Sequence, residues 1–237
     1  MTSRTPAAKP PLISNVLAKY IMAITGIVFA LFVMVHMYGN LKVYKGPEAF
    51  NDYALFLRTL FEPLFPYESF LWIFRVALLV CLIGHVGCAV LLSARAKKAR
   101  GSHKRRGLKG FKSFTARTMP VTGVVLLLFI IFHILDLTAG VGVAPAEFQH
   151  GSQAGSFAYE NLVASFQRPV VALIYLLAMV ILFLHLAHGL WAAVYDFGVT
   201  VSEKARSWVI LVAGVYALII MLGNISIPLA VLFGLVK

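Results

Sequence analysis

Five long apolar segments constrain the fold of this chain more than any other feature of its 237 residues. We place them at residues 17–40, 69–93, 118–140, 169–195 and 207–235. A helix needs about 20 apolar residues to cross the hydrocarbon core of a bilayer, so each segment is long enough. Hydrophobic residues make up 60% of the chain and charged residues only 13%. This composition leaves too little polar surface to cover the core of a soluble protein. The sequence predicts an all-α integral membrane protein, a bundle of five transmembrane helices forming one membrane domain over residues 1–237.

The charges of the connecting segments predict the topology. Residues 95–117 carry ten lysines and arginines and no acid, and loops of this kind stay on the cytoplasmic side. The N-terminus is then cytoplasmic and the C-terminus outside, and the two outer connections each contain a candidate interfacial helix, at 47–61 and 157–166. The basic excess indicates contact with anionic lipid headgroups, and we expect no binding of nucleic acid.

Histidines inside the apolar segments indicate a metal or cofactor. His36, His85 and His133 lie on the first three segments, and the fourth carries both His185 and His188. An unpaired imidazole in hydrocarbon costs on the order of a few kcal/mol, so each ring needs a hydrogen bond or a metal. One such histidine could simply join two helices. One on each of four successive segments favours ligation.

The depths of these histidines sort them into two layers. At about 1.5 Å per residue from each segment centre, His36 lies roughly 10 Å and His133 roughly 6 Å to the outer side of the midplane. His85 and His185 lie roughly 6 Å and 4–5 Å to the inner side. Two imidazoles per layer suit the two axial positions of one haem, which then has no open site for oxygen. Zinc is the competing metal, but its sites usually need three or four protein ligands.

Two ionisable residues inside the segments have open roles. Arg75 lies toward the outer end of the second segment, where it could pair with a haem propionate or extend to the membrane surface. Asp136 is one helical turn beyond His133 on the same face. It could be protonated, accept a hydrogen bond from a neighbouring helix or belong to a proton path.

Several motifs, taken in order, resemble a known family. They are Thr25-Gly26, the run from His36 to Asn40, Arg75 followed by His85, Met119-Pro-Val-Thr-Gly123 leading to His133 and Asp136, and His185-Leu-Ala-His188-Gly-Leu-Trp191. This order is similar to that in the di-haem cytochrome b membrane subunits of succinate:quinone oxidoreductases (succinate dehydrogenase and fumarate reductase), the kind with five spans in one polypeptide. The resemblance covers the first four segments, and the fifth carries no diagnostic residue.

The resemblance implies two haems b between spans one to four. Its ligands fall on His36 and His133 for an outer haem and on His85 and His185 for an inner one. His188 is the alternative fourth ligand, or else a partner of a propionate. The propionate candidates are Arg75, His188 and Asn40.

The resemblance also implies partners and a location. Succinate chemistry, flavin and iron–sulfur clusters would belong to a flavoprotein subunit and an iron–sulfur subunit, because no catalytic motif for them occurs here. The chain would be the quinone-reactive subunit of this enzyme of respiration and the tricarboxylic acid cycle, in a bacterial cytoplasmic membrane.

The number of haems predicts the side on which quinone reacts. A second haem is needed only if electrons cross toward the outer side of a core about 30 Å thick. The membrane potential is worth about 2.3 kcal/mol per charge per 100 mV and would help to reduce menaquinone, the expected quinone. Candidates to bind the quinone or deliver protons are Arg58, Glu62, Glu68 and Asp136.

Two alternative functions remain open from the sequence. One is the di-haem subunit of another quinone-linked complex, of the nitrate reductase, formate dehydrogenase or hydrogenase type. The other is a haem-free transporter or anchor in which the histidines relay protons or join helices. A spectrum of low-spin haem b distinguishes the last from the rest.

Overall fold

The computed structural model describes residues 12–102 and 111–237, of which 111–116 are described by their backbone alone. Over these ranges the chain is helical and contains no strand, which confirms the predicted all-α class. Lys104, Arg105, Arg106 and Lys109 of the predicted basic loop lie outside the described residues. The elements are α1 (Asn15–Asn40), η1 (Leu41–Lys45), α2 (Pro47–Thr59), α3 (Ser69–Arg100), α4 (Phe111–Ile134), η2 (Leu135–Ala139), α5 (Ala158–Phe166), α6 (Pro169–Asp196) and α7 (Glu203–Leu232).

Five helical segments are long and apolar enough to cross a membrane, as predicted. The two short helices α2 and α5 occupy the connections in which interfacial helices were expected. The spanning segments are Asn15–Lys45, Ser69–Arg100, Arg117–Ala139, Pro169–Asp196 and Glu203–Leu232.

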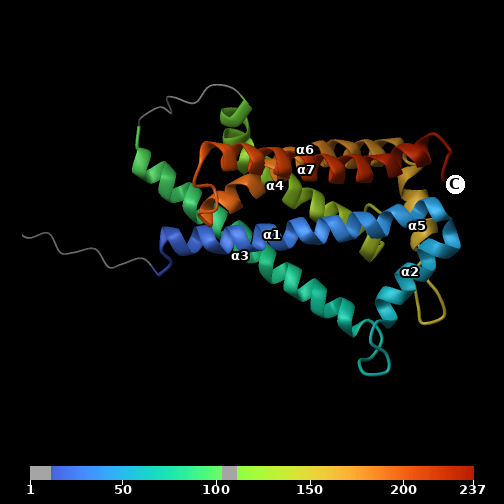
Figure 1. Ribbon diagram of the computed structural model, residues 1–237. Coiled ribbons are helices and arrows are strands. Elements are labelled where there is room, and N and C mark those ends of the chain that lie inside the picture. Colours follow the sequence, from blue (N-terminus) through green and yellow to red (C-terminus); the bar gives the residue numbers. More distant parts are fainter. Residues whose placement is uncertain (1–11, 103–110) are drawn as a thin grey trace, which may run out of the picture.

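Helix α6 is central to the packing. It packs against α1, α4 and α7, and α1 packs in turn against α3. Figure 1 shows α1, α6 and α7 running along one another and α4 lying obliquely to them, whereas α3 crosses α1 and diverges from the bundle toward its own start. Four of the spanning helices therefore form a compact group, and α3 is held mainly through α1.

The two ends of the bundle differ in charge and in structure. At the first end, which we call the basic end, α1 begins and α3 finishes; there the Lys19 ammonium lies 3.1 Å from Asp196, and Arg95 donates to the carbonyl of Ile13 at 2.9 Å. At the opposite end, the α5 end, α2 and α5 cover the bundle beside the C-terminus (Figure 1). Asn51 joins these two helices by donating to Glu160 at 2.9 Å.

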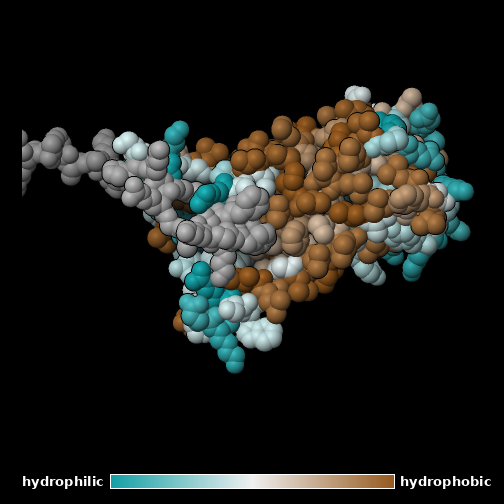
Figure 2. Space-filling view, turned by 90° about the horizontal axis from the view of Figure 1, so that it is seen from above, coloured by the Kyte–Doolittle hydropathy of each residue, from teal (hydrophilic) through white to brown (hydrophobic). Residues whose placement is uncertain are grey.

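The outer surface has the character expected of a membrane protein. Figure 2 shows a wide hydrophobic band between hydrophilic ends. Much of the band consists of large apolar side chains that face outward, such as Val80 and Ile83 of α3, which are 63% and 65% exposed. A bilayer would cover these side chains, because exposed apolar surface of this extent is unfavourable in water.

Helix α4 ends in a π-helical turn, η2, which is closed by a glycine. Gly140 adopts φ +65°, a left-handed conformation that side chains disfavour, and a Cβ atom built on it would collide with the ring of Phe148. Its neighbour Gly142 has φ +68° but nothing within 4 Å of such an atom. A comparison of substitutions at Gly140 and Gly142 therefore distinguishes the cost of backbone strain from the cost of a collision with Phe148.

Replacing Gly140 by Ala should destabilise the protein more than replacing Gly142 by Ala. Both variants bear the left-handed strain, about 1–2 kcal/mol, and only G140A also displaces Phe148. Thermal unfolding in detergent measures the difference. Equal melting temperatures for the two variants would contradict the role given to Phe148.

Candidate functional site

The structure brings His36 and His133 together near the α5 end. Their ring centroids are 5.8 Å apart and the planes lie at 86° to one another. His36 stacks on Phe32 one turn earlier in α1, and Phe129 lies one turn before His133 in α4, with a ring separation of 5.9 Å. The first pair thus joins α1 and α4, with aromatic rings beside both imidazoles.

The second pair comes from α3 and α6. His85 and His185 are neighbours in the bundle. The Nδ1 atom of His85 lies 3.0 Å from the hydroxyl of Thr25 in α1, and the Nδ1 atom of His185 lies 3.0 Å from the hydroxyl of Thr122 in α4. Each histidine is therefore oriented by a threonine from a neighbouring helix.

The glycine that follows each of these threonines leaves room for the imidazole. A Cβ atom on Gly26 would lie 3.4 Å from Cε1 of His85, and one on Gly123 would lie 3.5 Å from Cε1 of His185. The two Thr-Gly pairs therefore present the same surface to two different histidines.

The threonine hydroxyls also fix which ring nitrogen carries the proton. Thr25 donates its hydrogen to the carbonyl of Ile21 at 2.7 Å, and Thr122 donates to that of Met119 at 3.0 Å. A hydroxyl that has given up its one hydrogen can only accept from the imidazole. Nδ1 of each histidine is then the donor, and Nε2 keeps the lone pair that a metal needs.

The structure separates the roles of His185 and His188. His188 stacks on Trp191, with ring centroids 5.5 Å apart and an angle of 17° between the ring planes. The Arg206 guanidinium lies over the Trp191 ring, 5.6 Å from its centroid. These residues are closer to the basic end than His185. His185, which has the threonine partner and the neighbour His85, is the better candidate ligand.

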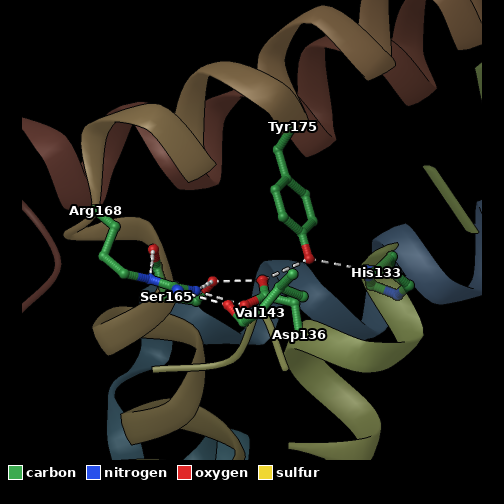
Figure 3. Close-up of polar contacts among 6 residues, drawn as sticks. All are labelled: His133, Asp136, Val143, Ser165, Arg168 and Tyr175. Atoms are coloured by element: carbon green, nitrogen blue, oxygen red, sulfur yellow. Dashed lines mark hydrogen bonds and ion pairs between the residues drawn. The ribbon is translucent and has the colours of Figure 1, made fainter. Parts of the chain in front are cut away.

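Asp136 is completely buried and lies at the centre of a polar network (Figure 3). It accepts hydrogen bonds from Ser165 at 2.5 Å, from Arg168 at 2.5 Å and from Tyr175 at 2.9 Å. The Tyr175 hydroxyl is in turn 3.3 Å from Nδ1 of His133. The network joins η2, α5 and α6 to a candidate ligand. Asp136 therefore accepts hydrogen bonds from other helices, which is one of the roles that the sequence left open.

Other predicted residues gather at the start of α3. Glu68 pairs with Arg58 at 2.9 Å and with Arg75 at 3.9 Å, and Arg75 also lies over the ring of Trp72 at 4.7 Å. Glu62 is exposed on the loop that precedes this cluster. The predicted propionate candidate Asn40 is half-buried at the last position of α1.

A surface hollow of about 660 Å³ adjoins this cluster. Its wall includes Tyr67, whose hydroxyl is buried and has no hydrogen-bond partner in the described part of the chain. Burial also raises the pKa of this phenol, which keeps the hydroxyl protonated and able to donate. The remaining wall is formed by Ser69, Trp72, Ile73, Val76 and Ala77.

The residues present fit a haem rather than a metal held by protein alone. Within residues 12–102 and 111–237, no three His, Cys, Asp or Glu side chains gather where they could hold an ion, and the histidines meet as pairs. A porphyrin supplies four of the ligands of its iron, so a pair of imidazoles completes the set. The half-buried rings and the adjacent Gly26 and Gly123 are consistent with a flat group between the helices.

Sequence reasoning missed most of the side chains that support the ligands. Thr25 and Thr122 were noticed only as parts of motifs, and Ser165, Arg168 and Tyr175 were not considered. The repeated Thr-Gly pair was an available signal. For Tyr175 no signal was available, because its partners come from other helices.

Fold and site together define a class, an integral membrane protein with paired histidines on four of its spanning helices. A family model described as the succinate dehydrogenase/fumarate reductase transmembrane subunit matches residues 94–222, more than half of the chain. The chain belongs to this family.

Comparisons with individual proteins agree with this assignment. The chain is similar to the succinate dehydrogenase cytochrome b558 subunit of Bacillus subtilis (strain 168), with 24% identity over 176 residues, which are 74% of this chain and 76% of the relative. No solved structure matches it.

Replacing Thr25 or Thr122 by Val should loosen haem binding by about 10–100-fold, the usual effect of removing a partner of a metal-bound histidine. The loss of haem to excess apomyoglobin measures it. Thr25→Ser keeps a hydroxyl at this position and should retain haem as the native protein does. Thr59→Val is a matched control, because the Thr59 hydroxyl bonds only to backbone carbonyls. Normal retention in both valine variants would contradict the role of the hydroxyls.

Proposed function

We propose that this chain is the membrane-anchoring cytochrome b subunit of a succinate dehydrogenase. It carries electrons through two bis-histidine haems b between an iron–sulfur subunit and a membrane quinone. The observation that supports this most is the presence of two histidine pairs on α1, α3, α4 and α6, where Thr25 and Thr122 leave Nε2 of His85 and His185 free to ligate. When bound, low-spin haem b accepts and releases one electron with no open position for oxygen.

The protein's part in this function is to hold and separate the two sites. His36 and His133 would ligate near the α5 end, and His85 and His185 toward the basic end. The aromatic and aliphatic side chains around them exclude water and lower the local dielectric. The helices thus provide two fixed positions along the membrane normal.

The charge distribution supports an orientation for this chain. Seven of its nine acidic residues lie at or near the α5 end, whereas Lys97, Lys98 and Arg100 are among the many cations of the basic end. Loops rich in lysine and arginine stay in the cytoplasm. We propose that the basic end is cytoplasmic in a bacterial inner membrane, and that the iron–sulfur and flavoprotein subunits bind there.

The ligand assignment predicts which haem each substitution removes. His133→Ala and His36→Ala should give the same spectrum, with one haem lost, because the two rings face one another. His85→Ala should remove the other haem. Reduced-minus-oxidised spectra and electron paramagnetic resonance of the purified complex measure this. Loss of different haems from the His133 and His36 variants would overturn the pairing.

The hollow at the start of α3 supports a quinone site at the α5 end. Its volume of about 660 Å³ is in the range of small-molecule sites. Glu68 is next in sequence to Tyr67 and Ser69 of its wall, and Tyr67 has a buried hydroxyl available to a quinone carbonyl. We propose that menaquinone binds here, with Glu68 delivering protons and Arg58 and Arg75 holding its carboxylate.

Glu68→Gln should lower quinone-linked turnover by about tenfold or more, because positioned proton donors contribute at least this much. Succinate oxidation by an artificial dye should stay unchanged. Glu48→Gln is the matched control, since this carboxyl is exposed on α2 and is not among the quinone candidates. Full quinone activity of the Glu68 variant would refute the site.

A further inference from the structure

The polar network around Asp136 reaches a candidate haem ligand through a single side chain. The Tyr175 hydroxyl has one hydrogen, and it lies 2.9 Å from Oδ2 of Asp136 and 3.3 Å from Nδ1 of His133 (Figure 3). A carboxylate is an acceptor only, so the Tyr175 hydrogen goes to Asp136. The Tyr175 oxygen then accepts from Nδ1 of His133, which leaves Nε2 for the metal.

This arrangement differs from the support of the other pair. The hydroxyls beside His85 and His185 give their hydrogens to backbone carbonyls, which are neutral. The hydroxyl beside His133 gives its hydrogen to a carboxylate that is 0% exposed. Hydrogen bonds strengthen one another along a chain in a low dielectric, so the Tyr175 oxygen is the stronger acceptor.

A stronger acceptor at Nδ1 makes an imidazole a better electron donor to iron. Donation of this kind stabilises the oxidised metal and lowers its reduction potential. Arg168 donates to Oδ1 of Asp136, and Ser165 donates to Oδ2, the oxygen that also accepts from Tyr175, so both oxygens of the carboxylate are held in place.

We propose that Asp136 and Tyr175 are positioning residues that lower the reduction potential of the haem bound by His36 and His133, relative to that of the second haem. This inference rests on the proposed function. It assigns to the network a task beyond joining η2, α5 and α6, namely to make the two sites unequal in the electron affinity of their haems.

The experiment is a redox titration of the purified complex, followed by optical and electron paramagnetic resonance spectra. Tyr175→Phe should shift the redox equilibrium of the His36/His133 haem at least tenfold toward reduction, or about 59 mV for one electron. The other haem should keep its potential. Tyr216→Phe is the matched control, since the Tyr216 hydroxyl bonds the carbonyl of Ala30 and no ligand.

Asp136→Asn should shift the same haem in the same direction. In a double-mutant cycle, its effect should largely vanish in the Tyr175→Phe background, because Tyr175 transmits it. Fully additive shifts would mean that Asp136 acts through its charge alone and would overturn the relay. If Asp136→Asn fails to assemble, Tyr175→Phe still decides, since it leaves the Asp136 ion pair intact.

Two outcomes of the titration contradict the proposal without touching the proposed function. One is a Tyr175→Phe complex with both haems and unchanged potentials, and the other is an equal shift of both haems. A wild-type complex that contains no low-spin haem b would instead defeat the proposed function itself. The two failures are therefore distinguishable.

Discussion

An imidazole ring in hydrocarbon must find a partner, and much of the polar structure of this protein meets that requirement. Water is absent from the bilayer core, so each ring nitrogen needs a hydrogen bond or a metal from within the bundle. For three of the four candidate ligands, Nδ1 is satisfied by a hydroxyl on another helix, from Thr25, Thr122 or Tyr175. The same contacts that orient the rings also join the helices in pairs.

The sequence was sufficient for the fold class and for recognising that histidines lie within the spanning helices, and the reason is physical. A membrane-spanning helix needs a long apolar run, and a histidine within such a run is conspicuous because burial of its ring is costly. The supporting contacts of Asp136 were not predictable. Arg168, which precedes α6, and Tyr175 of α6 lie more than 30 residues further along the chain than Asp136. Sequence spacing reports neighbours only within one helix.

The charged residues at the two ends of the bundle are stabilised in different ways. At the α5 end, carboxylates such as Glu68 and Asp136 are each held by an arginine, from positions 58 and 168. Paired in this way, a carboxylate can lie near or inside the apolar band at an acceptable cost. At the basic end many cations lie in the end turns of helices, such as Lys97, Lys98 and Arg100 of α3, where lipid headgroups and solvent can compensate them.

The attachment of α3 through α1 has a consequence for the position of His85. Helix α3 contacts chiefly α1, and it exposes side chains such as Val80 and Ile83 away from that contact. In lipid, apolar contact between helices brings no hydrophobic gain, so α3 is held by close packing on α1 and by hydrogen bonds such as those of Arg95 with Ile13 and of His85 with Thr25. The distance of His85 from the candidate ligands on the other helices is therefore set by the fit of a single pair of helices, α1 and α3.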